Sequence, residues 1–193
     1  TALAYISMLL NGFLLSPIFT IGLLPFFETI FKITTDYKLI ELSDLNLPIF
    51  KDMLVKTPGT YQHSIVVGNL AENAAELIGI NPLLVRAGAY YHDIGKMNKP
   101  EYFIENQTFP EENVHSKIKP ILSSSIIKSH IKVGLEMANT LKLPQEIKDI
   151  IQQHHGTSLI KIFYLQALEE AGENDIILEE DFRYPGPKPQ TKE

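Results

Sequence analysis

The stretch from Ala2 to Phe27 constrains the fold most, because it contains no charged residue over 26 positions. About 20 apolar residues suffice to cross a bilayer as a helix. We therefore predict a transmembrane helix over residues 1–31, with Pro17 and Pro25 kinking it or marking its end. A buried core helix is the alternative, but such helices seldom run this long without a charge. A signal peptide fits poorly, since the stretch has no basic leader and exceeds the usual apolar run of about 7 to 15 residues.

The apolar stretch is followed by lysines, at Lys32, Lys38, Lys51 and Lys56. Positive charge beside a membrane helix favours the cytoplasmic side, so we expect the remainder of the chain to lie in the cytoplasm. Because the first residue is a threonine, we expect the sequence to be part of a longer protein.

The composition limits the kinds of partner and site. A chain of 193 residues with 45% hydrophobic residues supports one sizeable core. A net charge of -6 argues against a general nucleic-acid surface, which needs clustered lysine and arginine, so we predict no nucleic-acid polymer as partner. The absence of cysteine removes disulfides and thiolate metal ligands.

The rest of the chain contains residues that typically begin and end helices, and it has no pattern that is typical of strands. Asn81-Pro82 is an N-cap followed by a proline that opens a helix, and Gly79 closes the helix before it. We predict an all-α fold, with a connector over residues 32–59 and a helical domain over 60–193. The predicted helices cover residues 48–56, 60–78, 82–93, 123–141, 144–155 and 158–171.

Five of the six histidines form an ordered pattern with an aspartate: His63, His92-Asp93, His130 and His154-His155. Four predicted helices each place a histidine among apolar residues of one face; His63, for example, shares its face with Val66, Leu70, Ala74 and Leu77. A single histidine on such a face is usually a satisfied core residue. Four buried imidazoles and the carboxylate of Asp93 are better satisfied together by a shared metal centre. Small residues at Gly88 and Ala89 would let another helix approach it.

This pattern resembles that of HD-domain phosphohydrolases, and several segments are similar to the seven-transmembrane HD family of cyclic di-AMP phosphodiesterases. These segments are Pro58–His63, Gly88–Lys96 (GAYYHDIGK), Phe103–Gln107 and Tyr184–Pro187. The resemblance implies an HD-domain helical bundle in a multi-pass protein of the bacterial cell membrane, with the HD domain in the cytoplasm and the apolar helix as its last span.

The resemblance also implies two divalent metal ions, iron or manganese, although the donor types allow zinc. His63, His92 and Asp93 would bind one ion, and His130, His154 and His155 the other, with Asp93 bridging. A hydroxide between the two ions would attack phosphorus and convert cyclic di-AMP to linear pApA. The resemblance implies that Lys96 holds a phosphate oxygen, as in related HD enzymes, so we assign Asp93 and Lys96 to catalysis. A solvated lysine at the end of a helix is the alternative for Lys96.

The loop from Met97 to Pro120 contains Tyr102, Phe103 and Phe109, which are candidates to stack on adenine bases. A packed loop without ligand contacts is the alternative for each of these rings. His115 lies in this loop outside the metal pattern, and it has no assigned role.

One departure from the family concerns its last ligand, an aspartate on a later helix. The chain ends at Glu193 without an obvious equivalent, and Thr191-Lys192-Glu193 has the pattern of a helix start. We therefore expect a C-terminally truncated HD domain that binds its first metal ion weakly.

Other functions stay open at this point. A cyclic di-GMP phosphodiesterase is the nearest, although Gly156-Thr157-Ser158-Leu159 lacks the pattern of the HD-GYP type. Further alternatives are another nucleotide phosphohydrolase, a dinuclear iron oxygenase and a noncatalytic membrane receptor for a cyclic dinucleotide. The sequence does not predict an oligomeric state.

Overall fold

A computed structural model describes residues 2–107, 113–172 and 175–193 of the chain. The chain divides into two compact units, Thr1–Lys38 and Leu39–Glu193, which we describe separately. The described residues contain helices and one isolated β-bridge between Leu159 and Arg183, but no strand, so the prediction of an all-α fold is confirmed.

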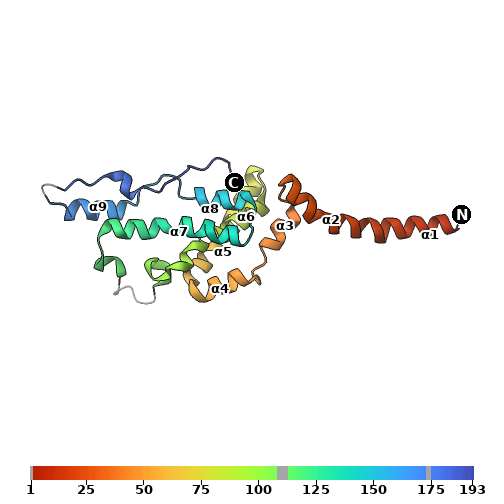
Figure 1. Ribbon diagram of the computed structural model, residues 1–193, viewed down its shortest axis with the longest axis horizontal. Helices are drawn as coiled ribbons and strands as arrows, with labels where there is room; N and C mark the ends of the chain where they lie inside the picture. The colour runs from red at the N-terminus through yellow and green to blue at the C-terminus, as the bar shows by residue number, and fades with distance from the viewer. Residues whose placement is uncertain (1, 108–112, 173–174) are drawn as a thin grey trace. The chain divides into compact units, whose positions relative to one another are not determined.

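The first unit is dominated by one long helix from Ala2 to Phe31 (Figure 1). It consists of α1 (Ala2–Leu10), a π-helical turn (Asn11–Leu15) and α2 (Ser16–Phe31). Its 30 residues are long and apolar enough to cross a membrane, as predicted, and none of its most apolar window is buried. Neither proline ends it: Pro17 lies in the first turn of α2 and Pro25 lies inside α2. The helix ends instead at Lys32, whose φ of 51° is left-handed.

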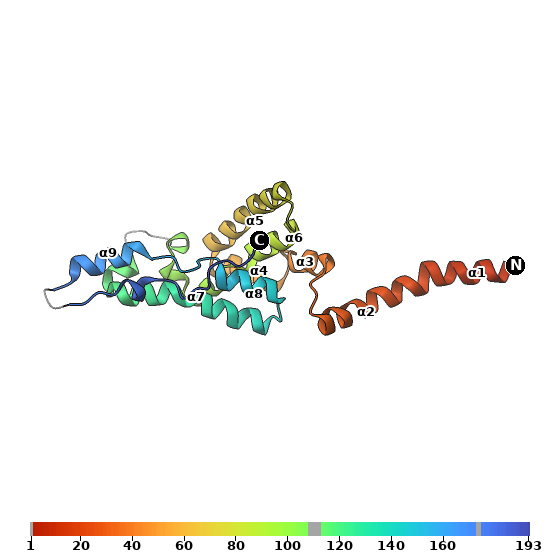
Figure 2. The ribbon, with the colours of Figure 1, turned by 90° about the horizontal axis from the view of Figure 1, so that it is seen from above.

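The second unit contains a bundle of helices of different lengths (Figures 1 and 2). The α-helices are α3 (Asp36–Leu42, which enters the unit at Leu39), α4 (Pro48–Lys56), α5 (Pro58–Ile78), α6 (Pro82–Tyr91), α7 (Pro120–Thr140), α8 (Gln145–Gln153) and α9 (Lys161–Glu170). Short 3₁₀ helices join them, among them η2 (Ile94–Asn98), η3 (Pro100–Tyr102), η4 (Ile104–Asn106), η6 (Val114–Lys117) and η7 (Glu179–Phe182).

Local residues explain most helix boundaries. A proline begins α4, α5, α6 and α7, where a missing N–H costs nothing. The side chain of Asn81 accepts hydrogen bonds from two backbone N–H groups of α6, and Gly79 ends α5 with a φ of 71°.

Several predicted boundaries differ from those in the structure. Helix α7 begins at Pro120 rather than Ser123, and α9 begins at Lys161 rather than Ser158. The backbone of Ser158 instead joins the C-terminal segment, because its carbonyl oxygen accepts a hydrogen bond from the N–H of Tyr184 at 2.9 Å. The predicted helix start at residues 191–193 is not helical in the structure.

The segment predicted as a connector contributes to the core. Leu39, Leu42, Phe50 and Met53 are all buried in the main hydrophobic cluster. The ring centroid of Phe50 lies 4.9 Å from that of Tyr91. The hydroxyl of Tyr91 donates a hydrogen bond to the carbonyl oxygen of Leu42. Helices α3 and α4 therefore pack on α6 as part of the bundle, while the division of the chain at residues 31/32 and 59/60 stays a prediction.

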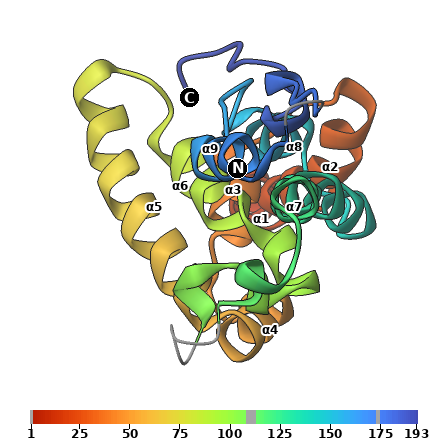
Figure 3. The same cartoon turned by 90° about the vertical axis from the view of Figure 1, so that its left-hand side faces the viewer.

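Close helix contacts bring the ends of α6 and α8 toward the middle of α7. Helix α5 packs along α6, α6 contacts α8, and α7 contacts η2 and α8 (Figure 3). Gly88 allows the approach predicted for it, since a Cβ there would meet Ile150 of α8 at 2.3 Å. Gly95 lies against the backbone of α7, where a Cβ would be 1.9 Å from the carbonyl oxygen of His130.

Candidate metal centre

The six predicted ligands come from four helices, and on two of these helices the ligands lie at the same point, directly after the last helical residue. His92 and Asp93 follow the last residue of α6, and His154 and His155 follow the last residue of α8. His130 lies in the middle of α7, and His63 lies in the second turn of α5.

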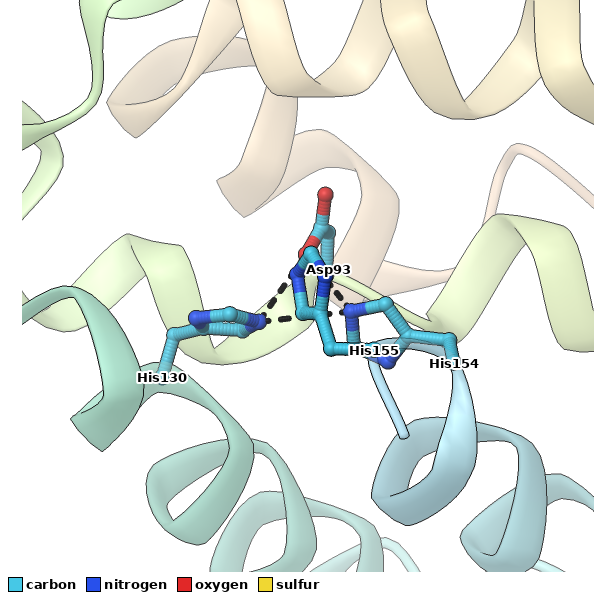
Figure 4. A group of neighbouring side chains, drawn as sticks. All are labelled: Asp93, His130, His154 and His155. Atoms are coloured by element: carbon cyan, nitrogen blue, oxygen red, sulfur yellow. Dashed lines mark hydrogen bonds and ion pairs between the residues drawn. The ribbon is translucent and has the colours of Figure 1, made fainter. Parts of the chain in front are cut away.

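The structure brings these side chains into two groups that share Asp93. One group is His63, His92 and Asp93; the other is Asp93, His130, His154 and His155, shown in Figure 4. Within each group the candidate ligand atoms all lie within 4.8 Å of one another. Asp93 Oδ2 lies 3.0 Å from Nε2 of His92, and Asp93 Oδ1 lies 3.4 Å from Nε2 of His130. These are the two sets predicted from the sequence, although their role as ligands stays a prediction.

Backbone carbonyl groups orient three of the imidazole rings. In each, Nδ1 lies 2.6–2.9 Å from the carbonyl oxygen three residues earlier; these are His92, His130 and His154. A carbonyl oxygen only accepts, so each Nδ1 carries the hydrogen and donates it. This arrangement leaves Nε2 directed toward Asp93, and it is the usual way in which proteins fix a metal-binding histidine.

Burial sets the charge of several of these groups. It lowers the pKa of His130 to about 4, and burial together with the neighbouring histidines lowers the pKa of His155 to about 3. Burial also lowers the pKa of His63. Burial opposes the charge on Asp93, but the neighbouring imidazoles of His92 and His154 hold its pKa well below the usual range. The lowered pKa values leave His63, His130 and His155 neutral beside an ionised carboxylate, which are the protonation states that metal binding requires. Burial opposes the charge on His92, but the neighbouring Asp93 raises its pKa.

The donor set fits divalent ions. Oδ1 of Asp93 is buried and lacks a hydrogen-bond partner among the described residues, which is costly for a carboxylate that binds nothing. The surrounding donors are imidazole nitrogens and one carboxylate, a combination that suits iron, manganese and zinc.

The expectation that His63 lies on a buried face is wrong. The residues predicted to share its face are exposed: Leu70 is 66% exposed and Leu77 is 88% exposed. The buried residues of α5 are instead small, and they are Thr60, Ser64, Gly68 and Ala75. Gly68 faces the ring of Tyr90, where a Cβ would be 2.5 Å from a ring carbon. His63 is exposed but still reaches the site, since its ring centroid lies 5.5 Å from that of His92.

Lys96 lies between two carboxylates at the edge of the site. Its Nζ is 2.9 Å from Oδ2 of Asp93 and 2.7 Å from Oε1 of Glu105. Burial opposes the charge on Lys96, but the two carboxylates outweigh it and raise its pKa. Glu105 also accepts a hydrogen bond from the hydroxyl of Thr60 at 3.1 Å, and Asn106 donates to the same hydroxyl at 2.8 Å.

The sequence reasoning missed the roles of Glu105 and Tyr184. Both residues lie in segments that carry the family resemblance. The resemblance therefore marked these segments, but it did not predict which residues the two side chains contact. The ring of Tyr184 stacks on that of His155, with a centroid distance of 4.0 Å and an interplanar angle of 9°. Among the aromatic residues of the loop from Met97 to Pro120, Phe103 has its ring centroid 5.8 Å from that of His130, whereas Phe109 lies outside the described residues.

Comparisons with known proteins identify the family of the chain. A family model described as "HD domain" matches residues 60–190. The chain is 53% identical over 178 residues to the cyclic-di-AMP phosphodiesterase PgpH of Bacillus subtilis, covering 92% of this chain and 24% of that protein. It is 51% identical over 173 residues to PgpH of Listeria monocytogenes, covering 90% of this chain and 24% of that protein. The chain thus spans about a quarter of the length of these relatives.

The fold is also similar to a solved structure, that of the L. monocytogenes PgpH HD domain in complex with cyclic-di-AMP. The TM-score is 0.70 at 52% sequence identity, covering 76% of this chain and 67% of that chain. The helices, the ordered histidines and the family model lead to the same assignment: this chain belongs to the HD domain family.

Proposed function

We propose that this chain is the catalytic domain, with a preceding membrane helix, of a metal-dependent phosphodiesterase that hydrolyses cyclic di-AMP to linear pApA. The observation that carries the proposal is the pair of ligand groups that share Asp93. It is supported by sequence identities of 53% and 51% to proteins named as cyclic-di-AMP phosphodiesterases.

The two groups of side chains would hold two divalent ions. His63, His92 and Asp93 would bind one ion, and the second group, His130, His154 and His155, would bind the other, with Asp93 shared. Iron or manganese is the proposed metal, because the donors are imidazoles and a carboxylate, and zinc is the alternative. When bound, such ions would supply Lewis-acid chemistry to phosphate oxygens and would activate a water molecule as the nucleophile.

Lys96 would hold a nonbridging oxygen of the phosphate. Its ammonium group lies 2.9 Å from Asp93, so a phosphate at the shared carboxylate is within its reach. Because the two neighbouring carboxylates raise its pKa, Lys96 carries its positive charge throughout the neutral range. A fixed positive charge beside the phosphate stabilises the negative charge that builds up during hydrolysis.

The location proposed for this domain is the cytoplasmic side of the bacterial cell membrane. The helix from Ala2 to Phe31 would be one span of a multi-pass protein, and the lysines that follow it favour the cytoplasmic side. Cyclic dinucleotides are highly charged and cross a bilayer poorly, so the substrate would be met in the cytoplasm.

The experiment that tests the proposal uses the purified full-length protein loaded with manganese or iron. Release of linear product is compared for cyclic di-AMP and cyclic di-GMP. We expect pApA from cyclic di-AMP, and we expect Asp93→Ala to abolish it because both ions lose their shared ligand. Asp52→Ala, at an exposed carboxylate paired with Lys56, is the matched control and should keep full activity.

Each contrary result identifies an alternative. Faster cleavage of cyclic di-GMP would reassign the substrate, and recovery of intact ligand with metal bound would favour a noncatalytic receptor. Oxygen-dependent loss of substrate without a phosphate product would favour an oxygenase. Full activity of Asp93→Ala would contradict the shared role of that carboxylate.

A further inference from the structure

His63 is a candidate ligand that its own side-chain contacts do not hold in place. Its side chain is exposed and makes no hydrogen bond to another described residue, and its ring contact is with His92 at a centroid distance of 5.5 Å. The other histidines of the two groups are each fixed by a neighbour. A carbonyl oxygen orients three of them, and the ring of Tyr184 stacks on His155. A different part of the structure must therefore hold His63 beside Asp93.

The position of His63 depends on the beginning of α5, one helical turn before it. Thr57 precedes this helix, but its side chain makes no capping hydrogen bond. The backbone N–H of Thr60 belongs to the first turn, where a helix provides no acceptor, and it donates instead to Oδ1 of Asn106 at 3.1 Å. Asn106 is 46 residues away in sequence, so the cap of α5 comes from a distant segment.

Three residues form a contact that we call the clasp: Thr60, Glu105 and Asn106. We propose that the clasp positions His63 for the metal ion that it would share with His92. The inference rests on the proposed function and deepens it, because it makes the occupancy of one metal position depend on residues outside both ligand groups. The clasp residues are positioning residues, since they would act through His63 rather than on the substrate.

The hydroxyl of Thr60 is the centre of the clasp. Thr60 is fully buried, and its hydroxyl donates to Oε1 of Glu105 at 3.1 Å and accepts from Nδ2 of Asn106 at 2.8 Å. Both partners belong to η4, so the donor and the acceptor function of one hydroxyl join α5 to η4. Because a buried polar group without a partner is costly, these hydrogen bonds hold the two elements at one separation.

Gly59 allows the two backbones to approach closely. A Cβ at this position would lie 1.8 Å from the carbonyl oxygen of Glu105 and 2.5 Å from its carbonyl carbon. The beginning of α5 therefore lies directly against the backbone of η4, and the hydrogen bonds of Thr60 determine how it lies there. Since Thr60 and His63 are three residues apart, they share a face of the helix, and a shift of one displaces the other.

The clasp is connected to the first ligand group through Lys96. Oε1 of Glu105 accepts from Nζ of Lys96 at 2.7 Å, and the same Nζ lies 2.9 Å from Oδ2 of Asp93. Asp93 and His63 belong to one ligand group, so the contacts form a closed loop from α5 through η4 and η2 back to His63. The histidines of the second group lie on α7 and after α8, outside this loop. Loss of the clasp should therefore weaken one metal position and spare the other.

The test measures manganese binding by calorimetric titration of the full-length protein. Thr60→Val removes the hydroxyl and keeps the shape of the side chain, whereas Thr60→Ser keeps the hydroxyl. His63→Ala identifies the binding step that depends on His63. We expect Thr60→Val to weaken that step by about 10- to 100-fold, the usual effect of losing a residue that orients a metal ligand, and to leave the other step unchanged. Thr60→Ser should restore most of the affinity.

A double-mutant cycle shows whether Thr60 acts through His63. If it does, Thr60→Val combined with His63→Ala should bind manganese no more weakly than His63→Ala alone. Additive losses would overturn the inference, and so would equal weakening of both steps by Thr60→Val. If His63→Ala itself left manganese binding unchanged, the clasp would have no ligand to position, and the inference would fall as well.

Two further variants control for folding. Ser64→Ala lies on the same buried face of α5 and removes a hydroxyl that has no hydrogen-bond partner among the described residues, so it should change neither step. Asn106→Ala removes the cap, and it should weaken the same step as Thr60→Val even if the latter fails to fold. A wild-type protein that binds two manganese ions but does not cleave cyclic di-AMP would refute the proposed function. Cleavage by the wild type, with unchanged manganese binding in both clasp variants, would refute the clasp alone.

Discussion

Gly95 is a residue at which even a single added methyl group should disturb the metal centre. A Cβ at this position would lie 1.9 Å from the carbonyl oxygen of His130 and 2.6 Å from the backbone N of Gly134. Both are backbone atoms of α7, so no rotation of a side chain can relieve the contact. We predict that Gly95→Ala forces η2 and α7 apart.

The size of the effect follows from the distances. An ordinary contact of a Cβ begins near 3.4 Å, so the two backbones must separate by about 1.5 Å (3.4 minus 1.9). Nε2 of His130 lies 3.4 Å from Oδ1 of Asp93, and Asp93 is two residues before Gly95, so the same shift would carry His130 away from the shared carboxylate. Overpacking a core costs roughly 1–3 kcal/mol when side chains can adjust. Since they cannot adjust here, we expect a loss of about 3 kcal/mol or more, or ~6–12 °C in Tm for a domain of about 150 residues.

The assay is thermal unfolding together with calorimetric titration of manganese. Gly88→Ala is the matched control, because its Cβ would meet Cδ1 of Ile150, the far end of a flexible side chain, at 2.3 Å. We expect Gly95→Ala to melt well below Gly88→Ala and to bind manganese more weakly. Equal Tm values and unchanged metal binding would refute the idea that backbone contact at Gly95 holds His130 in place.

Further predictions concern the groups around the metal centre. Removal of metal by a chelator should lower Tm, and manganese at 100 times its Kd should restore about 2.7 kcal/mol of unfolding free energy; an unchanged Tm would count against a structural contribution of the ions. Tyr184→Leu, which loses the stacking on His155, should weaken metal binding in competition with a chelator by about 10- to 100-fold, whereas Tyr184→Phe should not. Glu105→Gln should lower kcat/KM about tenfold, because it removes the negative charge that faces the ammonium group of Lys96 and weakens the hydrogen bond between them. Equal kinetics of Glu105→Gln and the wild type would show that Lys96 is held by Asp93 alone.

The parts of the fold that the sequence predicts best are those set by neighbouring residues. Asn81 caps α6 through its own side chain, and Gly79 ends α5 because it adopts a left-handed conformation at no steric cost. The beginning of α9 could not be predicted in this way. The carbonyl oxygen of Ser158 accepts a hydrogen bond from the backbone N–H of Tyr184, which is distant in sequence. This hydrogen bond competes with those of a first helical turn. The role of α3 and α4 in the core likewise depends on Phe50 meeting Tyr91, which no local pattern encodes.

The same distinction applies to the site. The spacing of His92-Asp93 and His154-His155 placed each pair at a helix end, and the structure brings both pairs to one point. The contacts of Glu105 connect Lys96, which is nearby in sequence, with Thr60, which is 45 residues away. Such contacts arise only when the 3₁₀ turns after α6 fold back on the start of α5, so the family resemblance marked the segment of Glu105 without predicting what its side chain contacts.

His63 shows that the histidines converge for a different reason from the one predicted. Helix α5 has large apolar residues on one face and small residues on another, so hydrophobic periodicity alone favours the face with Leu70 and Leu77. The structure buries the small face instead, because the large ring of Tyr90 needs the space above Gly68. Burial therefore does not select His63; it reaches Asp93 because the first turns of α5 run beside the end of α6. The six side chains converge because their helices meet or end at the same place. The apolar helix faces explain the positions of His92, His130 and His154 only.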